Sequence, residues 1–165
     1  MKISFSEMKK GDMNGVVDLY SRILHPSYIS YGEITEGLAV NSKRFSKDVR
    51  SKFKKYIIGS VNRKNRRVLV ARADGLVAGF VCVEIKKAAA GHLECWISDL
   101  GVDRLYRRSG IARKLIKKAK EWGKKEKAKY YFLESGHGNS NAHRLFESEG
   151  FSPLNIIFMG SVGRK

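Results

Sequence analysis

The segment from Val102 to Ala112 carries the residues best suited to binding a phosphate group. It lies between an apolar run that predicts a strand and a periodic run that predicts a helix. A helix N-terminus offers backbone N–H groups without intrahelical acceptors and a partial positive charge. Gly110 and Ala112 would let a pyrophosphate approach the backbone closely, while Arg107 and Arg108 would add charge-assisted hydrogen bonds. The alternative interpretation of these residues is a surface loop with one glycine and two arginines.

Hydrophobic periodicity predicts the elements that must position this loop. Helices are expected over residues 12–24, 45–61, 111–127 and 141–149. Strands are expected over residues 2–5, 68–71, 76–85, 92–102, 130–133 and 156–159. The stretch 27–42 has no clear period and is expected to be a loop, which at that length is often functional. The order βααβββαβαβ predicts an α+β fold (α/β, with a mixed sheet).

Length and composition predict one folded domain over residues 1–165. The chain has 165 residues and 42% hydrophobic content, which suffices for a core and excludes a disordered basic tail. Cys82 and Cys95 lie in apolar runs, so we expect reduced core cysteines rather than a disulfide. No apolar run approaches the ~18 residues of a membrane span, and the first residues lack the apolar core of a signal peptide. We therefore expect a cytoplasmic protein without a membrane partner.

The sequence is strongly basic, with 33 Lys and Arg against 16 Asp and Glu and a net charge of +17. Two stretches, 43–72 and 104–129, each hold twelve of the basic residues. Such runs are typical of solvated helix faces, but they also suit a polyanion such as nucleic acid or an acidic protein. Composition leaves both interpretations open.

Two motifs together resemble the GNAT superfamily of acetyl-CoA-dependent N-acyltransferases. The run Arg107-Arg108-Ser109-Gly110-Ile111-Ala112 is similar to the signature R/Q-x-x-G-x-G/A of that superfamily. A downstream pattern, N-x-x-A-x-x-L-Y/F-E-x-x-G-F, is matched by Asn139, Ala142, Leu145, Phe146, Glu147, Gly150 and Phe151. The resemblance implies an N-acetyltransferase that moves the acetyl group of acetyl-CoA to a primary amine by direct attack in a ternary complex.

The resemblance also implies a binding site for acetyl-CoA between two diverging strands, 92–102 and 130–133, with a β-bulge in the first. The residues implied to bind the pantetheine and acetyl groups are Leu100, Gly101, Val102, Asn139 and Phe146. Those implied to hold the pyrophosphate are Arg107, Arg108, Ser109, Gly110, Ile111 and Ala112. Asn139 could equally be a helix cap. No metal is expected.

Three acidic residues are candidates for the general base of amine acetylation. Glu134 ranks first, because it matches a glutamate of the ribosomal-protein N-terminal acetyltransferases in this superfamily. Asp99 ranks second, since it lies three residues before Val102; strand alternation places it on the apolar face of Cys95 unless a bulge turns it. Glu94 ranks third, because it lies farther along the strand. Each could instead be a surface or structural carboxylate.

Phe146 is the sharpest departure from the family pattern. Many relatives have a tyrosine at this position that protonates the leaving thiolate, and phenylalanine cannot do so. Tyr106, Ser135 or water would have to supply this proton, or no dedicated acid is needed.

The acceptor site is expected to include Tyr28, Tyr31, Glu33 and Trp96, with Glu36 as a second carboxylate near the amine. A chain at +17 should repel polycationic acceptors unless local acids override the field. A protein N-terminus or a lysine of an acidic protein therefore fits the charge better than a polyamine, and a small amine stays open. The alternative function is a basic module that binds nucleic acid or an acidic protein, with the same fold and weak activity.

Overall fold

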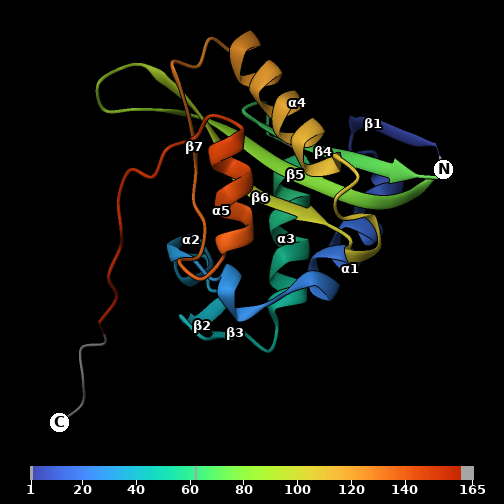
Figure 1. Ribbon diagram of the computed structural model, residues 1–165, viewed down its shortest axis with the longest axis horizontal. Helices are drawn as coiled ribbons and strands as arrows, with labels where there is room; N and C mark the ends of the chain where they lie inside the picture. The colour runs from blue at the N-terminus through green and yellow to red at the C-terminus, as the bar shows by residue number, and fades with distance from the viewer. Residues whose placement is uncertain (1, 62, 161–165) are drawn as a thin grey trace.

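A five-stranded mixed sheet forms the centre of the molecule (Figure 1). The computed structural model describes residues 2–61 and 63–160. Four strands, in the order β1-β4-β5-β6, pair antiparallel, and β7 adds to β6 in parallel. Their bounds are β1 (Ile3–Glu7), β4 (Arg66–Ala73), β5 (Leu76–Lys87), β6 (Leu93–Val102) and β7 (Tyr130–Leu133). The predicted α+β class with a mixed sheet is confirmed.

Helices cover both faces of this sheet and divide the core into two layers (Figure 1). On one face α1 (Met13–Ile23) and α3 (Val49–Val61) pack against Phe80 and Cys82 of β5. On the other face α4 (Ile111–Lys125) packs against Val81 and Val83. The central strand β5 is therefore buried on both sides, which explains its nearly continuous apolar sequence.

The sequence of α4 has the apolar spacing of an amphipathic helix. Its apolar side chains recur at helical spacing and are buried, while most of its lysines lie on the opposite face. The buried stripe consists of Ile111, Leu115, Ile116 and Ala119. Both cysteines are buried and free, as the apolar sequence around them predicts. No helix in the described ranges 2–61 and 63–160 is long and apolar enough to cross a membrane.

The stretch 27–42, expected to be a loop, contains short elements instead. It holds the end of a 3-10 turn (Pro26–Tyr28), the helix α2 (Tyr31–Thr35) and the strand β2 (Ala39–Asn41), which pairs with β3 (Arg44–Phe45). Helix α3 consequently begins at Val49 rather than at residue 45. Five residues are too few to show a helical period, but a capping box of Ser30 and Glu33 marks where α2 begins.

The strand predicted over residues 156–159 is wrong. Residues 151–160 have no regular secondary structure, and Ile156 and Phe158 are 68% and 90% exposed. In Figure 1 this segment follows α5 (Ser140–Ser148) and runs away from the sheet. Its apolar, β-branched composition favours an extended backbone, but a strand also needs a neighbour to pair with. The element order therefore ends with α5 and without the expected last strand.

Candidate active site

Strands β6 and β7 pair along only part of their length. Their parallel register runs from Glu94 opposite Tyr130 to Ile97 opposite Leu133, where β7 ends. Strand β6 continues to Val102. Along residues 98–102 the backbone on the β7 side is therefore not covered by a strand, and its polar groups need other partners.

A β-bulge lies at the point where the two strands part. Across β5 and β6, Val83 pairs with Ile97 but Cys82 pairs with Asp99, so Ser98 is the extra residue. The bulge expected from the family resemblance is confirmed. It reverses the side-chain alternation, because Ile97 belongs to the α4 layer of the core whereas Asp99 lies opposite Cys82 of the other layer.

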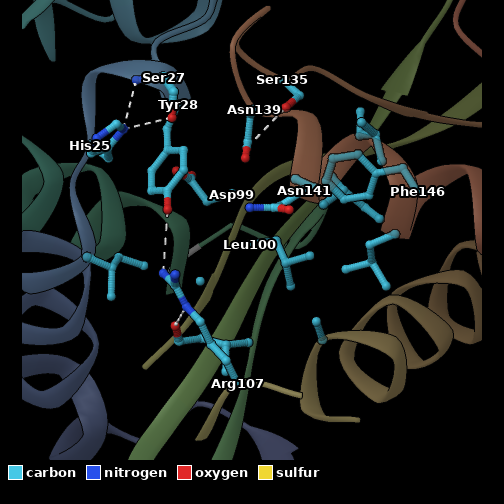
Figure 2. A pocket seen from close by; sticks show the side chains of 18 of the residues that line it. His25, Ser27, Tyr28, Asp99, Leu100, Arg107, Ser135, Asn139, Asn141 and Phe146 are labelled. Atoms are coloured by element: carbon cyan, nitrogen blue, oxygen red, sulfur yellow. Dashed lines mark hydrogen bonds between the residues drawn. The ribbon is translucent and has the colours of Figure 1, made fainter. Parts of the chain in front are cut away.

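One cavity of about 890 Å³ occupies the space beside this bulge. Its walls come from β6, the loop before α4, the end of α1 and the start of α5 (Figure 2). Most residues expected at a cofactor site line it: Leu100, Gly101, Val102, Arg107, Arg108, Gly110, Ile111, Ala112, Asn139 and Phe146. Ser109 is not among the lining residues; its hydroxyl donates to the carbonyl of Tyr106.

The loop before α4 holds an unusual backbone conformation that directs the helix N-terminus into the cavity. Gly110 has a φ of 82° and Arg108 a φ of 64°, both in the left-handed region. The first helical hydrogen bond runs from Lys114 N–H to Gly110 O (3.0 Å), so the N–H groups of the first turn have no intrahelical acceptor. This end of α4 is therefore suited to an anion.

Arg107 spans the cavity from this loop. Its Nε donates to Val102 O (3.4 Å) and its terminal nitrogen to the Tyr28 hydroxyl (3.5 Å), as Figure 2 shows. Loop 134–139 approaches the same region, because a Cβ on Gly136 would lie 2.4 Å from Ser27 O. Only glycine fits there, and this contact joins segments more than a hundred residues apart.

The three acidic candidates occupy different environments. Asp99 lines the cavity; burial raises the pKa of its carboxyl well above the ordinary value, and the charges of Glu33 and Glu36 raise it further. Glu134 also lines the cavity, but it is exposed and accepts a hydrogen bond from Gly32 N–H (3.0 Å).

Glu94 is not among the residues that line the cavity. Its carboxylate accepts from Trp96 Nε1 (2.8 Å) and lies 3.3 Å from His92 Nε2. The carboxylate of Glu94 therefore contacts its neighbours on and next to β6 rather than the cavity.

Of the residues expected at the acceptor site, some line the cavity and others do not. Tyr28 and Glu33 line the cavity, whereas Tyr31 and Trp96 do not. Tyr31 is exposed, and Trp96 stacks on Phe132 with ring centroids 4.9 Å apart.

The groups considered for the acid step all belong to the wall of the cavity. Phe146, Tyr106 and Ser135 all line the cavity. Asn139 precedes α5 without a side-chain capping bond and donates to Ser135 Oγ (3.3 Å). In Figure 2 these two side chains lie beside each other, joined by this hydrogen bond.

Tyr20 is a cavity residue that the sequence did not reveal. It belongs to the apolar stripe of α1, is 6% exposed, and its hydroxyl has no hydrogen-bond partner among the described residues. Its ring is stacked on Phe53 with centroids 3.6 Å apart. Burial raises the pKa of its phenol, and the charges of Asp99 and Glu33 raise it further. The only sequence signal was a phenol in a buried stripe.

Residues 34–151 match the model of the acetyltransferase (GNAT) family. The chain belongs to this family. The family match covers both motifs and the whole region of β6, α4 and α5 that builds the cavity. A comparison with curated proteins gave no significant match.

Solved structures of GNAT acetyltransferases share the fold. An aminoglycoside 6'-N-acetyltransferase from Acinetobacter haemolyticus is 15% identical over 100% of both chains, with a TM-score of 0.71. An aminoglycoside N-acetyltransferase in complex with CoA is 15% identical over 98% of this chain and 96% of its own, with a TM-score of 0.72. Glucosamine-6-phosphate N-acetyltransferase from Arabidopsis thaliana is 14% identical over 99% of this chain and 100% of its own, with a TM-score of 0.70. These TM-scores show a common fold.

The environment of Asp99 predicts that its charge destabilises the folded protein. Because the pKa is raised from the usual 3.8, the folded state binds a proton more tightly than the unfolded state. Stability due to this group is therefore lost as the pH rises from about 4 through the raised pKa. Asp99→Asn removes the penalty, and we expect it to raise Tm at pH 7 by about 2–4 °C, the shift that about 1 kcal/mol produces in a chain of this length.

Thermal unfolding of both proteins between pH 4 and pH 8 measures this effect. The gain should shrink toward pH 4, where Asp99 is protonated. Glu121→Gln on the exposed face of α4 is the matched control and should leave Tm within about 1 °C. An Asp99→Asn variant that is less stable than the parent at every pH would contradict the assignment.

Proposed function

We propose that this GNAT protein transfers the acetyl group of acetyl-CoA to a primary amine. One observation carries the proposal: the uncovered edge of β6 and the N-terminus of α4 line the same cavity. An extended acyl arm and a pyrophosphate need these two kinds of backbone donor, joined at one site. A structural relative in complex with CoA supports the choice of ligand.

The residues present fit acetyl-CoA, which supplies the activated acetyl group. Backbone groups of Leu100, Gly101 and Val102 on the side away from β5 would bind the pantetheine arm and the thioester oxygen. The N–H groups at the start of α4, with Arg107 and Arg108, would hold the pyrophosphate. Asn139 would bind the arm from the opposite wall.

Asp99 is the general base in this proposal, ahead of Glu134. A base works best when its pKa lies near the working pH, and burial moves Asp99 in that direction. Glu134 is exposed, and its carboxylate is already engaged by the hydrogen bond from Gly32 N–H (3.0 Å). Asp99 also lies on β6 next to the backbone that would bind the thioester. It would take the proton that the amine loses as the new C–N bond forms and the C–S bond breaks.

The leaving thiolate has no tyrosine at the family position, since Phe146 stands there. The two side chains considered as a replacement acid, Tyr106 and Ser135, both line the cavity. A CoA thiolate is a fairly good leaving group, so we assign no dedicated acid.

The basic surplus does not by itself support a nucleic-acid-binding function. Five of the twelve basic residues in 43–72 form salt bridges within the fold: Arg50, Lys52, Arg66, Arg67 and Arg72. Arg72 pairs with Asp12, and both side chains are largely buried. Five of these twelve residues thus have a partner within the fold, and we favour the enzyme over a polyanion-binding module.

Arg107→Ala tests the pyrophosphate site. Loss of a charge-assisted hydrogen bond should raise the KM for acetyl-CoA about tenfold and lower the rise in Tm that CoA produces. Lys125→Ala, at the far end of the same helix, makes the same charge change and should alter KM less than twofold. Equal effects of both substitutions would show that only net charge matters. No stabilisation of the parent protein by CoA would contradict the proposed function.

Asp99→Asn tests the base. We expect kcat to fall by about 10²-fold or more while the variant stays folded, because general-base catalysis contributes a factor of this size. Glu134→Gln should lower kcat much less. If Glu134→Gln lowered kcat strongly and Asp99→Asn did not, Glu134 would be the general base instead. The pH–rate profile of each variant provides the second readout.

A further inference from the structure

Three carboxylates face the same cavity from three different elements. Glu33 comes from α2, Asp99 from the bulge of β6 and Glu134 from the end of β7. Glu134 is tied to α2 through Gly32 N–H, and Glu33 accepts from the N–H and the hydroxyl of Ser30. Hydrogen bonds to the backbone therefore hold the carboxylates of Glu33 and Glu134 in place.

None of these three carboxylates pairs with a Lys or Arg within the described part of the chain. This is notable because the protein has about two basic residues for each acidic one. Seven other acidic residues do form such pairs: Glu7, Asp12, Asp18, Asp48, Glu84, Asp103 and Glu149. Acidic side chains without an ionic partner on one wall of a cavity attract a cation to that wall.

The hydroxyl of Tyr20 is an independent sign that a polar ligand belongs here. It is buried without a hydrogen-bond partner among the described residues, and Tyr20 lines the cavity together with Asp99 and Glu33. Stacking on Phe53 fixes the ring, so the hydroxyl cannot turn toward bulk water. An ammonium group has three donors, enough to satisfy both the phenol oxygen and a carboxylate.

We propose that the acceptor is a small aliphatic molecule carrying two or more ammonium groups, held by Glu33, Glu134 and Tyr20. This rests on the proposed acetyl transfer, in which Asp99 receives the proton from the reacting amine. The remaining ammonium groups lie against Glu33 and Glu134, and they offset the repulsion that a net charge of +17 imposes on any cation. An amine with a single charge can pair with only some of these three side chains.

Matched acceptors test the proposal with acetyl-CoA as donor. The panel contains 1,4-diaminobutane, spermidine, butylamine and a peptide with a free N-terminus. We expect kcat/KM for the diamine to exceed that for butylamine at least tenfold. Glu33→Gln and Glu134→Gln should each raise the KM for the diamine about tenfold and that for butylamine much less, so the preference falls. Tyr20→Phe should act in the same direction.

Glu121→Gln, which removes an acid from the exposed face of α4, should leave the preference unchanged. Equal kcat/KM for butylamine and the diamine, or a preference for the peptide, would overturn this inference and leave acetyl transfer standing. An equal effect of Glu33→Gln on both amines would also overturn it. Failure to acetylate any amine would overturn the proposed function as well.

Discussion

The extra residue at Ser98 is the constraint on which the cavity depends. It shifts the register between β5 and β6 at the point where β6 loses its pairing with β7. Without it, Asp99 would stay on the face of Cys95 and Ile97, inside the apolar layer under α4. With it, one strand presents an uncovered backbone edge and a carboxylate to the same space. The bulge places the carboxylate, and the end of β7 beside it leaves the backbone edge uncovered.

Cationic and anionic side chains both line this space, at different places on its wall. Arg107 and Arg108 lie beside the N-terminus of α4, where the helix dipole adds to their field. The unpaired carboxylates lie on α2, β6 and β7. Elsewhere many basic side chains are neutralised by ion pairs such as that of Arg72 with Asp12. Net charge alone gave the impression of a general anion binder, whereas the structure shows one cavity with cationic and anionic walls.

The parts of the site that could be predicted are those set by local sequence. Arg107 to Ala112 surround the start of a helix, and both the helix and the glycine before it are readable from the chain. The position of Asp99 could not be predicted, because it depends on register between strands. Likewise α2 is too short for a period, and Tyr20 looked like an ordinary core residue. Residues 156–159 show the converse. Their strand propensity is evident from the sequence, but whether a neighbouring strand is present to pair with them is not.

Site-resolved amide hydrogen exchange with and without CoA tests the central claim most directly. If CoA binds along the uncovered edge of β6 and at the start of α4, it should protect the amides of residues 98–102 that face away from β5, together with those of Ile111, Ala112 and Arg113. The amides of Glu94 to Ile97, already within the sheet between β5 and β7, should change little. Protection confined to other segments, or no protection at either place, would contradict this account.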